Sequence, residues 1–239
     1  HDTCTTGCSG RACTCEPEAD GATTPTGTGT RDSYNIQDLS DMIPGSQSGE
    51  RSLVTYDEFL ASFGQKNDRI LAGWLGPDAS AERIRRVGEA KEQEYRRLAE
   101  QHGLTPLPGA AEWIHRLHER GWKQAIASSA PRENVRVMLR ALAVDRDFDA
   151  IVSAEDVTAG KPDPQVFVRA ADRLGLPPER CIVVEDAAVG IEAARRAGIK
   201  SIGVSRGAPL DADIAVSALS DLPDDAFELP GAIGIADVA

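Results

Sequence analysis

Two adjacent acids are the most informative residues that could do chemistry in this sequence. Glu185 and Asp186 follow an apolar run, residues 181–184, that predicts a buried parallel strand. Ligands of open α/β sheets bind outside the carboxyl ends of the strands, and paired carboxylates are hard oxygen ligands that suit Mg²⁺. In the alternative interpretation Asp186 caps the next helix and Glu185 complements its dipole. Capping alone does not explain two adjacent acids, so the metal role is favoured.

A lysine and two serines extend this candidate site. Lys161 lies in a short loop between Gly160 and Pro162, where its ammonium can offset the charge of a phosphoryl group. Ser128 and Ser129 end another predicted strand, and hydroxyls with backbone amides at a strand-to-helix turn can hold an anion. Turn serines and exposed loop lysines are the plainer alternatives. The shared position at strand ends indicates one phosphate and Mg²⁺ site.

The elements that must position these side chains alternate in type after residue 106. Apolar periodicity predicts helices over residues 109–120, 132–142, 163–174 and 187–197, and strands over residues 123–128, 149–153, 181–184 and 200–204. This alternation predicts an α/β fold, with a parallel sheet and right-handed crossovers. The stretch 232–236 in the tail is apolar and predicts a short edge strand.

Residues 53–105 predict a separate helical region. Two short pieces, 56–63 and 67–75, precede a long helix over residues 81–102, which Ser80 can cap and Gly103 can end. The predicted apolar seam of the long helix consists of Ile84, Val87, Tyr95 and Leu98. Its charged residues are expected to be solvated, and these are Arg83, Arg85, Arg86, Glu89, Lys91, Glu92 and Glu94.

Residues 1–52 differ from the rest in composition. They are rich in Thr, Gly, Ser, Asp and Pro, show no sustained apolar periodicity, and predict a low-complexity or disordered segment. Cys4, Cys8, Cys13 and Cys15 lack the usual paired spacing of a zinc site, so zinc or local disulfides stand as alternatives to incidental cysteines. The chain begins without Met and without an apolar leader, which suggests a fragment or a processed start.

The overall charge narrows the expected partners. The 239 residues carry a formal net charge of −12, which argues against nucleic-acid binding and against an anionic membrane surface. No apolar stretch approaches the roughly 20 residues of a membrane helix. We therefore expect a cytoplasmic protein, a monomer or weak dimer, whose partner is a small phosphorylated metabolite.

As a set, the motifs resemble those of the haloacid dehalogenase superfamily, in its β-phosphoglucomutase-like branch. The resemblance covers about residues 53–228 and rests on the segments 126–135, 160–164 and 184–194, with 63–68 and 107–109 also typical. It implies a helical cap over residues 53–105, a Rossmann-like core over residues 106–228, and a tail over residues 229–239.

The resemblance also implies roles for single residues. Ser128 holds the phosphate, Lys161 stabilises a phosphoaspartate, and Glu185 with Asp186 binds Mg²⁺. In the cap, Lys66 or Asn67 contacts the substrate phosphate. Family members transfer a phosphoryl group to an aspartate nucleophile and then to water or a sugar. The expected function is thus that of a Mg²⁺-dependent phosphatase or phosphomutase acting on a small phosphate ester such as a sugar phosphate.

One family motif has no clear counterpart in this sequence. It is an apolar strand that ends in Asp-x-Asp-Gly before the cap, and residues 1–52 contain no such strand. The nearest string, Glu18-Ala19-Asp20-Gly21, makes Asp20 a candidate catalytic residue, and Ile235-Ala236-Asp237 also places an acid after an apolar run. Without the central strand, the sheet is expected to have a gap between the strands that end at Ser128 and Val184. The second hypothesis is a non-catalytic relative that binds Mg²⁺ and phosphometabolites or a protein partner.

Overall fold

The computed structural model describes residues 33–35, 53–55, 62, 64–205, 207–228 and 235–236. All of them belong to one compact unit, Asp32–Ala239. The clustered cysteines, Asp20, Asp237 and nearly all of the piece predicted over residues 56–63 lie outside the described residues. Among the described residues, no helix is long and apolar enough to cross a membrane.

The helices predicted over residues 67–75 and 81–102 of the cap region are present with the predicted bounds. Helix α3 spans Asn67–Leu75 and helix α4 spans Ala81–His102. The Ser80 hydroxyl accepts the Arg83 N–H at 3.2 Å, and Gly103 ends α4 with a positive φ of +69°, which glycine adopts without strain. A strand pair was not expected here: β1 (Ser33–Asn35) pairs antiparallel with β2 (Leu53–Thr55). Such short strands depend on a partner distant in sequence, so local periodicity does not reveal them.

The buried face of α4 differs from the predicted seam. Val87 is buried as expected, but Tyr95 and Leu98 are 37% and 41% exposed. Glu92, predicted to be solvated, is only 8% exposed. The reason is tertiary, because α4 packs on α3 and on the core helix α6 (Arg132–Ala141), which select a face that contains this acid.

The core elements also follow the predicted order, with ends that differ by a few residues. The other α-helices are α5 (Ala110–Glu119), α7 (Gln165–Leu174) and α8 (Ala188–Ala197), and the short 3₁₀ turns are η1 (Ala154–Asp156), η2 (Pro178–Arg180) and η3 (Leu219–Asp221). The strands are β3 (Ala125–Ala127), β4 (Ala150–Val152), β5 (Ile182–Glu185), β6 (Lys200–Val204), β7 (Ile214–Val216) and β8 (Ile235–Ala236).

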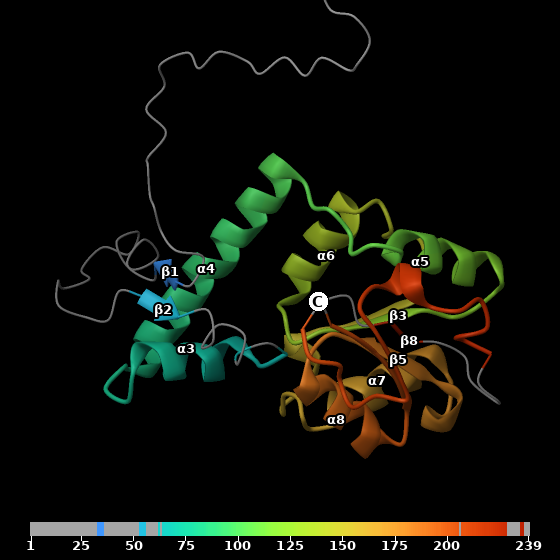
Figure 1. Cartoon of the computed structure of the whole chain (residues 1–239). Helices are drawn as coiled ribbons and strands as arrows, with labels where there is room; N and C mark the ends of the chain where they lie inside the picture. The colour runs from blue at the N-terminus through green and yellow to red at the C-terminus, as the bar shows by residue number, and fades with distance from the viewer. Residues whose placement is uncertain are drawn as a thin grey trace, which may run out of the picture. The chain divides into compact units, whose positions relative to one another are not determined.

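The strands form two hydrogen-bonded groups, both parallel. One group is β3–β4, and the other has the order β7–β6–β5–β8. Strand β8 contacts β3 as well as β5, and Figure 1 shows β8 between them. Strand β8 hydrogen-bonds to β5 at the edge of its group, so the prediction of a short edge strand near the C-terminus is confirmed. Its contact with β3 places it in the expected gap, without hydrogen-bonded pairing to β3 among the described residues. Two apolar residues carry no information about which partner they will pair with, so the sequence does not reveal this position.

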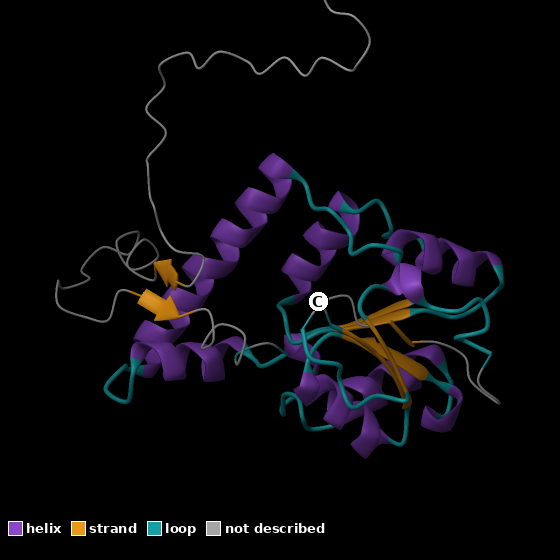
Figure 2. Ribbon diagram, in the orientation of Figure 1, coloured by secondary structure: helices purple, strands orange, loops and turns teal. Residues whose placement is uncertain are grey.

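Helices cover both faces of this sheet, as Figure 2 shows. Along β5, Val183 faces a cluster built with α7 and α8, whereas Ile182 and Val184 face a second cluster that contains Trp113 and Leu117 of α5. Successive side chains of a strand point to opposite faces, so a continuous apolar run is needed when both faces are covered. The apolar pattern of β5 thus reflects a central strand, as predicted.

An acid after β4 joins three elements of the core. Asp156 lies in η1, where it accepts the Ser153 N–H at 2.8 Å and the Arg173 guanidinium at 2.6 Å. Arg132 at the start of α6 also pairs with it. The hydrogen bond from Arg173, with those from Ser153 and the charge of Arg132, holds the pKa of the Asp156 carboxyl well below its usual range.

We expect Asp156→Asn to lower the free energy of unfolding by about 1–3 kcal/mol at pH 7, because two arginines lose a charged acceptor. Because folding lowers this pKa, the stabilisation is present above the unfolded pKa of about 4 and is lost as the pH falls below it. Urea unfolding at pH 7 and pH 3 measures this, with the exposed Asp225→Asn as the charge-matched control. An equal difference from wild type at both pH values contradicts the assignment.

Candidate functional site

A buried ion pair lies at the centre of the candidate site. The Lys161 ammonium lies 2.7 Å from Oε2 of Glu185, and the side chains of the two residues are 2% and 1% exposed. The ammonium also lies 5.0 Å from the ring centroid of Phe167. The loop before α7 thus presents a cation to the carboxyl end of β5. The predicted proximity of this lysine and this acid is present in the structure.

The turn from β5 into α8 is built around the Glu185 carboxylate. Its Oε1 accepts the Ala187 N–H at 3.1 Å. A Cβ atom on Gly190 would lie 2.0 Å from Cδ of Glu185, so only glycine leaves room for the carboxylate. Ala187 is the N-cap residue of α8 and no side chain caps this end. The alternative that Asp186 serves as a helix cap is therefore not supported.

Asp186 is the second acid at this strand end. Burial, together with the negative charge of Glu185, raises the pKa of its carboxyl to about 6. Two carboxylates held this close suit a hard divalent cation, which would remove the repulsion between them. Among the described residues, no group of three or more His, Cys, Asp or Glu side chains could hold a metal. The described part of the chain thus supplies two carboxylates at this strand end, of which that of Glu185 also accepts from Lys161 and from the Ala187 N–H.

The predicted serines lie where β3 ends. Ser128 is 5% exposed, its N–H donates to the Val152 carbonyl at 2.9 Å, and its Oγ accepts the Ala130 N–H at 3.1 Å. The Ser129 hydroxyl donates to the Gly64 carbonyl at 2.8 Å. Both serines line a cavity of about 340 Å³ that Lys161 also lines. The structure therefore brings the serines and the lysine to one cavity.

The two cap residues predicted to contact a substrate phosphate have different positions. Asn67 lines the same cavity. The Lys66 ammonium instead donates to the carbonyls of Ala154 and Val157, at 3.2 and 3.1 Å, and does not line the cavity. Its stem packs where a Cβ on Gly160 would lie. Lys66 thus joins the cap segment to the loop after β4.

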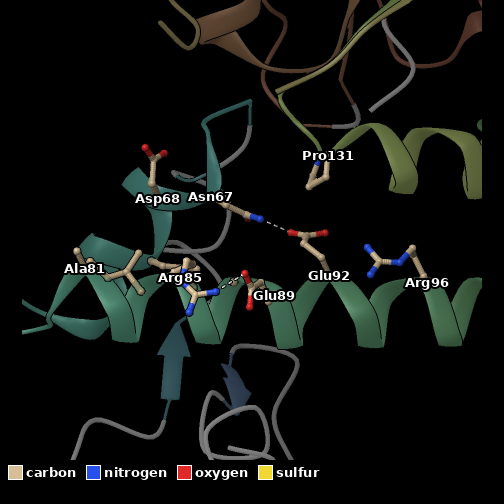
Figure 3. A pocket seen from close by; sticks show the side chains of 11 residues that line it. Asn67, Asp68, Ala81, Arg85, Glu89, Glu92, Arg96 and Pro131 are labelled. Carbon is tan, nitrogen blue, oxygen red and sulfur yellow. Dashed lines mark hydrogen bonds and ion pairs between the residues drawn. The ribbon is translucent and has the colours of Figure 1, made fainter. Parts of the chain in front are cut away.

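A polar cluster around Glu92 was missed in the sequence analysis. Asn67 and Glu92 line both this cavity and a second one of about 550 Å³, whose lining side chains Figure 3 shows. The Glu92 carboxylate accepts hydrogen bonds from the side-chain amides of Asn67 and Asn134, and it pairs with Lys91. Arg96 donates to Oδ1 of Asn134 at 2.7 Å. The cluster therefore ties α4 of the cap to α6 of the core. Its sequence signal is faint: Glu92 lies four residues after Gly88 and seven before Ala99, on one helical stripe.

A parallel α/β sheet whose polar residues meet at the strand ends, with a helical cap over them, is the architecture of a recurrent class of hydrolases. The profile of the haloacid dehalogenase-like hydrolases matches residues 27–198, and this chain belongs to that family. The match starts within the segment whose composition is unusual. Within the family, the chain is similar to β-phosphoglucomutases in sequence and in fold.

Individual relatives agree with this placement. β-Phosphoglucomutase of Bacillus subtilis is 40% identical over 136 residues, which are 55% of this chain and 58% of that protein. A phosphorylated carbohydrates phosphatase of Thermotoga maritima is 35% identical over 118 residues, 49% of this chain and 52% of that protein. The chain thus spans little more than half the length of these relatives. The crystal structure of a Clostridium difficile β-phosphoglucomutase has a TM-score of 0.67 at 23% identity, covering 80% of this chain and 85% of that one, and shows the shared fold.

We expect Gly190→Ala to destabilise the protein by about 1–3 kcal/mol or more, because the added methyl group overlaps the Glu185 carboxylate. Gly73→Ala is the matched control, since it lies in α3 with nothing within 4 Å of the added atom. The control should raise stability by about 0.5–1 kcal/mol through helix propensity. Chemical denaturation measures the free energy of unfolding of both variants. Equal changes in that free energy would show that the Glu185 carboxylate does not lie against Gly190.

We also expect Glu92→Gln to weaken the contact between α4 and α6 by about 1–3 kcal/mol, because the single remaining oxygen cannot accept from both asparagines. Amide hydrogen exchange of the two helices measures the change. Glu89→Gln removes the same charge from the exposed face of α4 and should leave exchange in α6 as in wild type. Two results are inconsistent with the cluster's role. One is faster amide exchange in α6 of the Glu89→Gln control, and the other is wild-type exchange in α6 of Glu92→Gln.

Proposed function

We propose that this protein is a Mg²⁺-dependent phosphoryl-transfer enzyme, a phosphatase or phosphomutase acting on a small phosphate ester such as a sugar phosphate. The observation that carries the proposal is the buried Lys161–Glu185 pair at the carboxyl end of β5, whose Lys161 lines, with Ser128, a cavity beneath the cap. Family membership supports the same chemistry. The names of relatives that act as a phosphoglucomutase and a carbohydrate phosphatase favour a sugar phosphate.

Each residue has a physical task in this proposal. The Ser128 hydroxyl and the amides of its turn hold the phosphate oxygens by hydrogen bonds. Lys161, kept buried by its pairing with Glu185, offsets the negative charge that spreads over the phosphoryl oxygens during transfer. Glu185 and Asp186 would hold the Mg²⁺ ion. When bound, that ion neutralises phosphoryl charge and orients the ester.

Further assignments in the proposal concern the reacting carboxylate and the cap. A carboxylate nucleophile would take up the phosphoryl group and release it to water or to a sugar hydroxyl. Asp20 is the sequence candidate for that carboxylate and lies outside the described residues. Ser129 and Asn67 line the cavity and are proposed substrate contacts. Lys66, which holds the loop after β4, would act on the substrate only through that loop.

The first test is hydrolysis of p-nitrophenyl phosphate by the full chain, with Mg²⁺ or with EDTA. We expect activity only with Mg²⁺, and a fall of at least about 100-fold in kcat for Asp186→Ala and for Lys161→Met, because the first removes a proposed Mg²⁺ ligand and the second removes the cation that offsets phosphoryl charge. Asp172→Ala removes an exposed acid from α7 and should retain wild-type activity. Activity that survives EDTA and both substitutions contradicts the proposal.

The same preparation tests the second hypothesis, a non-catalytic protein that binds Mg²⁺ and phosphometabolites. The observation that favours it is the absence, among the described residues, of a third acid beside Glu185 and Asp186. Folded protein that binds Mg²⁺ in calorimetry but shows no turnover supports this alternative. Loss of turnover in Asp20→Asn, with Mg²⁺ binding retained, would instead assign the nucleophile.

A further inference from the structure

The C-terminal strand β8 lies beside both hydrogen-bonded groups of core strands. It runs parallel to β5, with Ile235 opposite Val183 and Ala236 opposite Val184. On its other side it contacts β3, which hydrogen-bonds to β4 in a group of its own. Strand β8 has more contacts with β3, and more with β5, than β3 and β5 have with each other. Figure 1 shows the three strands in the order β3, β8, β5.

The proposed catalytic residues are divided between these two parts. Ser128 directly follows β3, and its N–H donates to Val152 of β4. Glu185 ends β5, and it carries Lys161 with it through the ion pair. The distance between the serine and the ion pair therefore depends on how far apart β3 and β5 are held. Strand β8 contacts the backbone of both, and α7 shares an apolar cluster with side chains of both strands.

The sequence of this segment suits a strand in the middle of a sheet. From Leu229 to Ala236 it contains no charged residue, and proline occurs only at its start, as Pro230. A central strand needs apolar residues because both of its faces are covered, and it excludes proline because its amides pair with neighbours. With only two paired residues, β8 is a short strand, so its pairing is expected to be less stable than that of β5 with β6.

We propose that β8 is the positioning strand of the site, which pairs with β5, packs beside β3 and so sets the spacing of Ser128 from the Lys161–Glu185 pair. The structural part of this proposal stands without any assumption about chemistry. Its consequence for catalysis rests on the function proposed above. Hydrogen exchange therefore tests whether β8 holds its neighbouring strands, and turnover tests whether that position matters for catalysis. The structural proposal and the proposed function can thus fail separately.

The first experiment uses the unmodified full chain. We expect the amides of Ile235 and Ala236 to exchange at least 10-fold more slowly than those of a free peptide with the sequence of residues 229–239, because a strand between two neighbours is protected. Exchange at the rate of the free peptide would overturn the proposal.

The second experiment compares Ala236→Pro with Ala239→Pro. A proline at 236 removes an amide within β8 and disrupts its pairing, whereas the control changes the chain end outside the strand. For Ala236→Pro we expect amide hydrogens in both β3 and β5 to exchange at least 10-fold faster than in wild type. We also expect its turnover of p-nitrophenyl phosphate to fall at least 10-fold. Ala239→Pro should show neither change. A variant that loses its cooperative fold while the control keeps it also supports the proposal. Wild-type exchange in β3 and β5 of Ala236→Pro refutes it.

Discussion

The ion pair between Lys161 and Glu185 is the interaction on which the rest of the site depends. Burying a lone ammonium or carboxylate costs several kcal/mol, so each of these groups is tolerated in the core because the other is 2.7 Å away. The pair fixes the loop before α7 against the end of β5, and Gly190 supplies the space that the carboxylate needs. An apolar pair would fill this volume at less cost, so the charge itself is what the proposed chemistry uses.

A strand from the C-terminal end of the chain, β8, lies beside the strand that carries this pair. The family resemblance places a strand from before the cap at the centre of the core, and in this structure β8 contacts β3 and β5 from the C-terminal side. A parallel strand needs only the right polarity and an apolar surface, so its origin in the sequence is not fixed by the fold. The serine turn follows β3 and the two acids stand at the end of β5, so both lie at carboxyl ends of parallel strands.

The cap contributes a second buried charge, the Glu92 carboxylate, which links helices of the cap and the core. Glu92 faces two asparagine amides and Lys91, so its carboxylate joins α4 to α6, and the residue lines both cavities. Charged hydrogen bonds are directional, whereas apolar contacts allow neighbouring helices to slide. A polar cluster at this place can therefore hold one relative position of cap and core while the pocket walls stay open to a polar ligand.

The sequence by itself determined the order of the core elements, the limits of α3, α4 and β6, and the placing of Ser128, Lys161, Glu185 and Asp186 at strand ends. These features follow from short-range periodicity and from chain order, which a linear pattern records. Only the tertiary structure decided the burial of Glu92, the use of Lys66 on backbone carbonyls, and the position of β8 beside β5. Each of these depends on a partner many residues away, and the identity of that partner is set by packing in three dimensions, which no local pattern encodes.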